Sequence, residues 1–242
     1  MLYIITGHSR GFGRGIAEQA LAQGAQVRGI SRSKAQDFDH ENLSQLELDL
    51  SQSSSWEQAA DFIGADLAQH TAVTLIHNAG IISPIGLAGE HHALGEVAKA
   101  VNLNLGAIIA LSEIFISKTQ DLAIEKRIVC ISSGAGRRPL PAWGTYCATK
   151  AAVDMFAQVV ATEQASRPHP VQIASLAPGV IDTGMQAQIR EQSAEAMPGV
   201  ERFVELKENG LLWSAEEAAS RLLTWVHGPS FGDEVLVDLR KV

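Results

Sequence analysis

The chain has 242 residues and a formal net charge of −8, with 46% hydrophobic and 19% charged residues. This composition is typical of a well-packed globular protein, and the length fits one large α/β domain or two small ones. The acidic balance argues against a nucleic-acid-binding protein, and the one adjacent basic pair, Arg137-Arg138, is interpreted as a solvated turn rather than an anion site.

Short apolar runs alternate with helical patterns from one end of the chain to the other. The expected strands cover 2–6, 25–32, 43–50, 72–77, 127–132, 171–177 and 234–239. The expected helices cover 14–23, 55–69, 90–117 and 144–164, with a last helix that begins near 214. The strand at 72–77 is apolar almost throughout, which is typical of burial on both faces of a parallel sheet. The alternation predicts one doubly wound, Rossmann-type α/β domain over 1–242, with a mostly parallel seven-stranded sheet flanked by helices.

Two helix starts and one polar segment stand out within this pattern. Ser55 is in position to cap the helix over 55–69, and Ser214 with Glu217 forms a capping box. The stretch 182–210 is polar and interrupted by Met-Pro-Gly. It follows the carboxyl end of a strand, where ligands bind in open α/β sheets. We therefore interpret it as a lid over a substrate rather than a plain surface excursion.

Cysteines, histidines and apolar runs give no sign of a metal site or a membrane anchor. Cys130 and Cys147 are interpreted as reduced, and neither has a partner at metal-ligand spacing. The eight histidines are dispersed except for His91-His92. We expect no apolar run as long as a membrane span, and the first residues enter a strand without a charged leader. The expected location is therefore the cytoplasm.

A glycine-rich turn follows the first expected strand and precedes the first expected helix. Gly7, Gly11 and Gly13 lie in it. Glycines at this place let the backbone approach a pyrophosphate, whose charge the helix N-terminus favours. The strand–turn–helix context indicates a dinucleotide site.

The end of the second expected strand bears on the choice of dinucleotide. An acidic residue there would accept hydrogen bonds from an adenine ribose, but the chain has Ser31 and Arg32, and Arg10 lies in the glycine turn. Two guanidinium groups suit a 2′-phosphate. This favours NADP(H) over NAD(H), with two solvated arginines as the alternative.

Tyr146 and Lys150 are four residues apart in the expected helix over 144–164, so they share one helix face. An ammonium beside a phenol stabilises the phenolate, so we expect the pKa of Tyr146 to fall from about 10 toward neutrality. The tyrosine would then act as a general acid toward a developing alkoxide. An interfacial tyrosine and a solvated lysine would give the same spacing, so the pair alone is weak evidence.

Five motifs in order resemble the short-chain dehydrogenase/reductase family over nearly the whole chain. The turn at 6–13 is similar to the family's T-G-x-x-x-G-x-G, and 77–80 reads H-N-A-G where the family has N-N-A-G. Ser133 precedes Tyr146 by thirteen residues, Tyr146 and Lys150 form Y-x-x-x-K, and P-G follows at 178–179.

The resemblance implies four catalytic residues. Tyr146 would be the proton donor, Lys150 would lower its pKa and hold the nicotinamide ribose, and Ser133 would polarise the substrate carbonyl. The family also uses an asparagine in a proton relay. Asn104 is preferred for that role, with Asn102 as the alternative.

The resemblance also implies a set of residues that bind NADPH or NADP in the glycine turn and at the strand ends. They are Gly7, Ser9, Arg10, Gly11, Phe12, Gly13, Ser31, Arg32, Asp49, Leu50, Asn78, Ala79, Gly80, Tyr146, Lys150, Pro178, Gly179, Ile181 and Thr183. Within this set, Asn78 would steady the central strands, and Asp49 with Leu50 would border the adenine.

The stretches 6–14 and 177–186 resemble the sepiapterin reductase and benzil reductase branch of the family. That branch reduces ketones of vicinal dicarbonyl compounds with NADPH, which implies the same reaction here. Asp238 would anchor a pterin by this resemblance, or would simply form a turn, and the chain lacks an aromatic-rich tail. Apolar or aromatic ketones are favoured by the expected substrate contacts, which are Ser133, Leu140, Trp143 and Met185 above Ala79, Gly80 and Ile81.

Three other functions fit parts of the pattern. Arg10 and Arg32 speak against an alcohol dehydrogenase that works oxidatively with NAD. A non-catalytic NADPH sensor would often lack Tyr146 or Lys150, and a methyltransferase would not explain them. The family resemblance implies a homodimer or homotetramer that pairs through the helices at 90–117 and 144–164, with a small carbonyl compound as substrate and no nucleic-acid or membrane partner.

Overall fold

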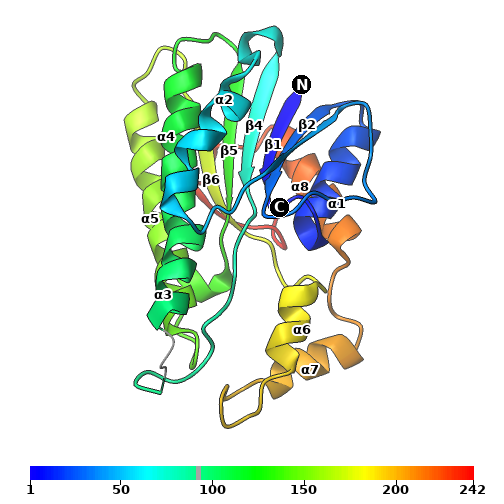
Figure 1. Ribbon diagram of the computed structural model, residues 1–242, viewed down its shortest axis with the longest axis vertical. Helices are drawn as coiled ribbons and strands as arrows, with labels where there is room; N and C mark the ends of the chain where they lie inside the picture. Colours follow the sequence, from blue (N-terminus) through cyan, green and yellow to red (C-terminus); the bar gives the residue numbers. More distant parts are fainter. Residues whose placement is uncertain (91–93) are drawn as a thin grey trace.

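A computed structural model describes residues 1–90 and 94–242, and its centre is one parallel sheet (Figure 1). The strands are β1 (Leu2–Thr6), β2 (Gln26–Ser31), β3 (Leu43–Glu47), β4 (Ala72–His77), β5 (Glu125–Ile131), β6 (Gln172–Ala177) and β7 (Leu236–Asp238). They form a seven-stranded sheet in the order β3-β2-β1-β4-β5-β6-β7, and every pairing is parallel. The order reverses between β1 and β4, which places a crevice at the carboxyl ends of these two strands.

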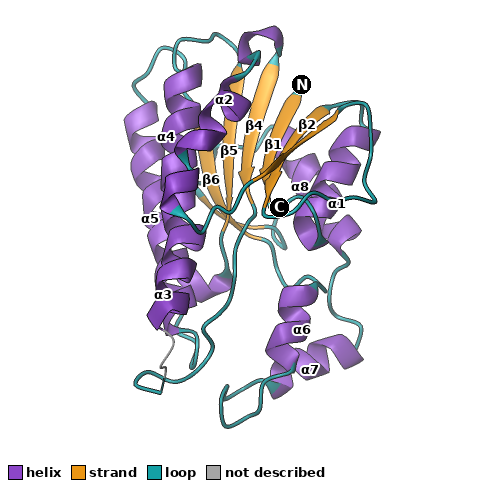
Figure 2. Cartoon of the chain, in the orientation of Figure 1, coloured by secondary structure: helices purple, strands orange, loops and turns teal. Residues whose placement is uncertain are grey.

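Helices cover both faces of the sheet (Figure 2). They are α1 (Gly11–Ala22), α2 (Ala60–Gly64), α3 (Leu94–Val101), α4 (Ala107–Thr119), α5 (Gly144–Gln164), α6 (Gly184–Arg190), α7 (Glu201–Glu208) and α8 (Ala215–His227). One apolar cluster joins α1 and α8 to one face, and a second joins α2, α4 and α5 to the other. The central strands β1 and β4 are buried at every position because each face of the sheet is covered. This confirms the predicted doubly wound architecture.

The prediction of one continuous helix over 55–69 is wrong. The stretch contains α2, flanked by short 3-10 turns, and Ser55 makes no side-chain cap. Arg28 of β2 donates to the carbonyls of Phe62 (3.2 Å) and Ala65 (2.5 Å), which occupies the carbonyls where the helix ends. Asp66 then adopts a left-handed conformation with φ of 49°, which a continuing helix excludes.

The other boundaries differ less. β3 ends at Glu47 rather than at 50, β7 has only three residues, and α1 begins at Gly11 rather than at 14. Ser214 does cap α8, because its Oγ accepts from the Glu217 amide at 3.0 Å.

The helical stretch Leu94–Thr119 corrects the expectation about membrane spans. It joins α3, a π-helical turn (Asn102–Gly106) and α4, and it is long and apolar enough to cross a membrane, with a mean hydropathy of 1.6. In the fold this stretch packs beside α2 and α5, and 39% of its apolar window is buried. The predicted start at 90 was too early, since Glu90 is not helical, and the pair His91-His92 lies outside the described residues.

Candidate active site

The glycine turn has the geometry of a pyrophosphate cradle. Gly7 and Gly11 have φ of 71° and 56°, which suits glycine. A Cβ on Gly13 would lie 2.3 Å from both the Asn78 Nδ2 and the Gly7 carbonyl oxygen, so only glycine fits there. The N-terminus of α1 has no side-chain cap, which leaves its first amides to a ligand. The residues present therefore fit a dinucleotide.

Asn78 fixes this turn to the next strand. Its side-chain amide donates to the carbonyls of Thr6 (3.1 Å) and Gly7 (3.2 Å), and its backbone amide donates to Thr6 Oγ1 at 3.0 Å. The Ala79 amide donates to the same hydroxyl. Asn78 thus ties β1, β4 and the glycine turn together, as its predicted role requires.

The adenosine end of the site differs in one respect from the prediction. Ser31 is buried, and its hydroxyl faces the Ser33 carbonyl (2.8 Å) and the His8 Nδ1 (3.2 Å) rather than solvent. Its side chain is thus turned away from a ribose phosphate. Arg10 and Arg32 are both exposed and are free to meet one.

His8 explains why Ser31 turns inward. Its ring is fully buried over Gly29, where a Cβ would approach it to 2.3 Å. Its Nε2 donates to Gln45 Oε1 at 2.8 Å, and the same oxygen accepts from the Ala35 amide at 2.9 Å. Burial lowers the pKa of His8. This chain of contacts shapes the loop after β2 that carries Arg32.

The π-helical turn separates the two candidate asparagines. Asn104 is fully buried, and its side chain accepts from the Ile81 amide (2.9 Å) and donates to the Ile81 carbonyl (2.8 Å). Asn102 instead donates to the Ser51 carbonyl at 3.1 Å. A Cβ built on Gly80 would lie 3.3 Å from Asn104 Oδ1 and 3.8 Å from Lys150 Nζ, so these two groups flank one point. Of the two candidates, Asn104 is thus the one that lies beside Lys150.

Ser133, Tyr146 and Lys150 meet where β5 ends and α5 begins. Ser133 directly precedes a 3-10 turn (Gly134–Gly136), and its Oγ accepts from the Ala135 amide at 3.1 Å. Lys150 Nζ lies 5.6 Å from the centre of the Tyr146 ring and donates to the Ile131 carbonyl at 2.7 Å. The helix spacing brings Tyr146 and Lys150 together, and the Ser133 hydroxyl faces the Tyr146 phenol from the end of β5.

The pKa of Tyr146 moves in the opposite direction from the one expected. Burial raises the pKa of this phenol to about 12, although the facing Ser133 hydroxyl favours the phenolate. Burial also lowers the pKa of Lys150 to about 8, although the nearby Asp154 carboxylate favours the charged form. Desolvation outweighs the attraction between an ammonium and a phenolate because both groups lie inside the protein.

The histidine that replaces the family's first asparagine is neutral and structural. His77 is buried at the end of β4, and its Nε2 lies 2.9 Å from the Ser112 hydroxyl of α4. Burial and the nearby Lys150 lower the pKa of His77 to about 3. It therefore adds no charge beside Lys150.

An apolar cluster includes Tyr146 and packs against its ring. Trp143 is only 4% exposed, packs edge-to-face on Tyr146 with ring centres 5.7 Å apart, and stacks on Phe203 at 5.4 Å. Its indole N–H points at the Met197 sulfur, 3.3 Å away. Phe203 and Met197 belong to the predicted lid, so Trp143 lies between the lid and the tyrosine. Leu140 and Met185 are half-buried members of the same cluster.

The remaining predicted contacts lie along the carboxyl edge of the sheet. Gly179 has φ of 86°, and the Arg240 side chain lies 3.5 Å from where its Cβ would be. The Asp238 carboxylate accepts from Arg240 Nε (2.8 Å) and Nη2 (2.5 Å), and this guanidinium lowers the pKa of Asp238. Asp238 is therefore already engaged by an internal partner.

Other residues of this edge complete the predicted set. Thr183 directly precedes α6 and contacts the space over Gly11. Ile181 is buried and bridges to Trp213. The Asp49 carboxylate accepts from the Ser51 amide, and this bond together with the charge of Arg32 lowers its pKa despite the cost of burial.

The interpretation of Arg137-Arg138 as a solvated turn holds for the backbone, since both residues lie in an exposed bend, but not for the Arg137 guanidinium. The Arg137 side chain is 27% exposed and pairs with Asp154, which is 7% exposed, at 2.9 Å. Arg138 is exposed. Sequence reasoning missed this pair, because nothing local indicates that Arg137 meets a helix residue seventeen positions later.

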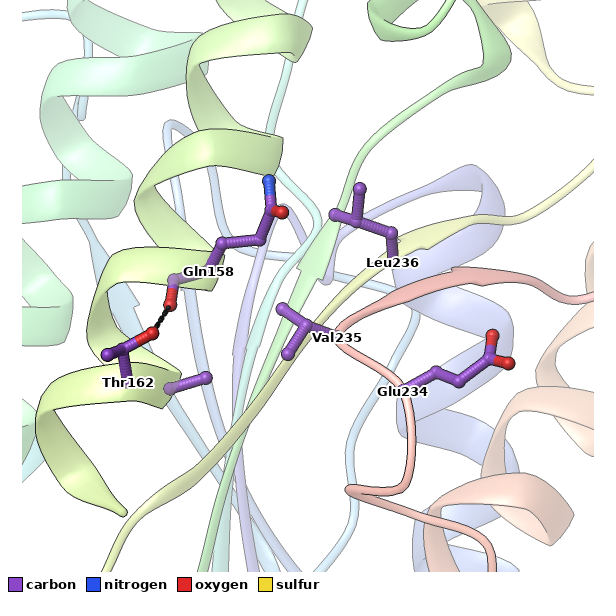
Figure 3. Close-up of a pocket in the computed structure, with 6 residues that line it drawn as sticks. Gln158, Thr162, Glu234, Val235 and Leu236 are labelled. Atoms are coloured by element: carbon purple, nitrogen blue, oxygen red, sulfur yellow. Dashed lines mark hydrogen bonds between the residues drawn. The ribbon is translucent and has the colours of Figure 1, made fainter. Parts of the chain in front are cut away.

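One cavity lies away from this site. A hollow of about 570 Å³ lies between α5 and the segment before β7 (Figure 3). The hollow is lined by Gln158, Thr162 and Val235. Of these, Gln158 lies roughly 18 Å along α5 from Tyr146 at the usual helical rise. Within the described residues, no three His, Cys, Asp or Glu side chains cluster so as to hold a metal ion.

Comparisons with known proteins agree with this geometry. The family model for short chain dehydrogenases matches residues 2–194. The chain is 40% identical over 225 residues to a benzil reductase ((S)-benzoin forming) of Bacillus subtilis, covering 92% of each, and 31% identical over 260 residues to the sepiapterin reductase of Bos taurus, covering 98% of this chain and 93% of that one. A crystal structure of a short chain dehydrogenase/reductase from Saccharomyces cerevisiae superposes with a TM-score of 0.84 at 25% identity, covering 98% of this chain and 95% of that one. The chain belongs to the short chain dehydrogenase/reductase family.

Proposed function

We propose that the protein reduces a ketone carbonyl of an apolar or aromatic 1,2-dicarbonyl compound, with NADPH as cofactor. The observation that carries this proposal is the meeting of Ser133, Tyr146 and Lys150 beside Asn104, on the same sheet edge as the glycine turn. A proton donor, a carbonyl-polarising hydroxyl and a dinucleotide cradle are the parts that carbonyl reduction needs.

The side chains divide the proton chemistry among themselves. When bound, a reduced nicotinamide supplies the hydride. The Ser133 hydroxyl donates to the substrate oxygen, and Tyr146 transfers its proton to that oxygen as negative charge develops. The Lys150 ammonium stabilises the phenolate that remains and binds the ribose hydroxyls. Asn104 and Lys150 flank one point near Gly80, which suits a relay that returns a proton to the tyrosine.

The apolar surroundings of Tyr146 support a ketone rather than a polar substrate. The cluster next to the tyrosine contains Ile82, Trp143 and Met197, with Leu140 and Met185 at its margin. Similarity to benzil reductases favours an aromatic dicarbonyl. A pterin is less favoured, because the carboxylate that would anchor it is paired with Arg240.

An absorbance assay of cofactor oxidation tests the proposal. Benzil, phenyl-1,2-propanedione, diacetyl and sepiapterin are each offered with NADPH and, separately, with NADH. We expect the fastest turnover with NADPH and an aromatic dicarbonyl. Tight NADPH binding without turnover of any of the four ketones would contradict the proposal and favour a sensor role.

The rate should depend on the charge of Lys150. Because the pKa of Tyr146 is about 12 and that of Lys150 about 8, raising the pH through 8 removes the lysine proton while the tyrosine keeps its own. We expect kcat/KM for NADPH, which reports groups of the free enzyme, to be level below this pKa and to fall above it. A pH–rate profile measures this.

Lys150→Arg is the control for the pH profile, since arginine stays charged throughout this range. The variant should be slower but should lose the fall above pH 8. A fall that persists in the arginine variant would assign the titration to another group.

We also propose that the protein forms a homodimer or homotetramer through α3–α4 and α5. Five large apolar side chains are exposed on these helices, namely Leu94, Val101, Ile109, Met155 and Val159. Met155 and Val159 lie one turn apart on the same face, and an exposed apolar patch of this kind marks an interaction surface.

Charged substitutions on α5 should dissociate the oligomer. Met155→Glu with Val159→Glu places like charges against a partner surface, so light scattering after size-exclusion chromatography should show the mass of one chain. Leu211→Glu is the matched control, because Leu211 is exposed but lies outside these helices. A wild-type chain that is already monomeric would exclude this interface.

A further inference from the structure

Arg137 joins four segments of the active-site edge. Its Nε donates to Asp154 Oδ2 of α5 at 2.9 Å, and its Nη1 and Nη2 donate to the carbonyls of Val237 in β7 and Ser175 in β6, each at 3.1 Å. The Ser175 hydroxyl donates to the other Asp154 oxygen at 2.6 Å. The planar guanidinium thereby fixes three acceptors at once, which a lysine ammonium could not do with the same geometry.

The segment that Arg137 anchors begins with Ser133. Only the turn Gly134–Gly136 separates the two residues, and the Ser133 Oγ caps this turn. The turn lies directly against α5, since a Cβ on Gly136 would approach the Lys150 carbonyl carbon to 2.7 Å and the Ala151 amide to 2.9 Å. A shift of Arg137 therefore moves Ser133 relative to α5.

Asp154 sits at the other end of this connection. It lies one helical turn after Lys150 and two turns after Tyr146 on α5. The Arg137–Asp154 pair thus spans the joint between the strand that ends in Ser133 and the helix that carries the proton donor.

We propose that Arg137 is a positioning residue, which through Asp154 holds the Ser133 hydroxyl at its working distance from Tyr146. The expected effects on rate rest on the proposed carbonyl reductase function. The expected effect on the position of Ser133 relative to Tyr146 does not depend on the substrate. A displacement of a reacting group by about 1 Å lowers a rate about 100-fold, so this joint bears directly on turnover.

The groups that face Lys150 show how Asp154 affects the charge state of this lysine. Tyr146 and Asp154 face it from α5, Cys130 from β5 and His77 from β4. His77 is neutral and Cys130 stays a thiol, because burial raises the pKa of Cys130 to about 12. The Asp154 carboxylate, held by Arg137, is therefore the anion that supports the Lys150 ammonium.

Alanine variants of the two neighbouring arginines form a matched pair. We expect Arg137→Ala to lower kcat by about 10- to 100-fold, while KM for the ketone and Kd for NADPH change by less than about threefold. Arg138→Ala should match the wild type, because the Arg138 side chain makes none of these contacts with Asp154, Ser175 and Val237. Added guanidinium ion should restore part of kcat in Arg137→Ala alone. Unchanged kcat in Arg137→Ala would overturn the inference.

A spectroscopic measurement separates this inference from the proposed function. The chain has two tyrosines, so ¹³C NMR of the labelled phenol carbon in the NADP complex should show one signal from each. Arg137→Ala should shift the Tyr146 signal and leave that of Tyr3, which is buried in β1, in place. If the wild type reduces no ketone, the proposed function fails, yet this signal still decides the inference.

A second pair of variants covers the case in which Arg137→Ala does not fold. Arg137→Lys keeps the positive charge of the first partner, and Asp154→Asn keeps the size of the second. Each variant should shift the Tyr146 signal away from its wild-type position. Each should also lower kcat by about three- to tenfold. Tyr146 signals identical to the wild type in both variants would overturn the inference.

Discussion

Replacement of Tyr146 by phenylalanine should lower kcat for ketone reduction by about 10²- to 10⁴-fold, the usual contribution of a positioned general acid. The ring of Tyr146 packs on Trp143, and phenylalanine keeps that edge-to-face contact. The loss should therefore fall on kcat, with the Kd for NADPH nearly unchanged. Steady-state kinetics with fluorescence titration of NADPH measures both quantities.

Tyr3→Phe is the control for this experiment. Tyr3 is the other tyrosine of the chain, and its hydroxyl contacts His227 on the opposite face of the sheet. Its removal should change stability but leave kcat near the wild-type value. Retention of more than about a tenth of kcat in Tyr146→Phe would show that another group or water donates the proton.

Removal of both Arg10 and Arg32 should reduce the preference for NADPH over NADH by about 10²-fold or more, at the usual worth of two charge-assisted hydrogen bonds. Both side chains are exposed beside the adenosine end of the glycine turn, whereas Ser31 is turned inward. The measurement is the ratio of kcat/KM for the two cofactors in Arg10→Ala/Arg32→Ala and in each single variant.

Lys34→Ala controls for general positive charge on the same loop, since Lys34 is exposed two residues after Arg32. It should change the cofactor ratio by less than about threefold. A wild-type preference for NADH, or a double variant with an unaltered ratio, would contradict the role of the arginines.

The sheet and the spacing of the candidate catalytic residues could be predicted from the sequence for identifiable reasons. Strands such as β4 are buried on both faces, so their residues are apolar almost throughout. The candidate site residues are fixed by short spacings. Tyr146 and Lys150 lie one helical turn apart, and Gly7, Gly11 and Gly13 lie in the short stretch that leads from β1 into α1. Local spacing within one element survives folding unchanged, and so these predictions needed no tertiary information.

The features that were predicted wrongly from the sequence depend on contacts between distant segments. Arg28 of β2 ends α2 through carbonyls 34 and 37 residues away. The raised pKa of Tyr146 depends on burial by Trp143 and the segments that cover it, which no helix spacing contains. Ser31 turns inward because of His8, whose ring needs the space over Gly29. In each case the partner was present in the sequence but was not marked by a motif.

Trp143 carries a consequence for how this enzyme can change its substrate range. It touches Phe203 and Met197 of the predicted lid on one side and Tyr146 on the other. A change of this segment to admit a larger ketone would therefore expose the phenol to water and alter its acidity together with the shape of the pocket. If Tyr146 is the proton donor, as proposed, selection for a new substrate acts on the donor too, and variants with a changed segment should require compensating changes in the loop that precedes α5.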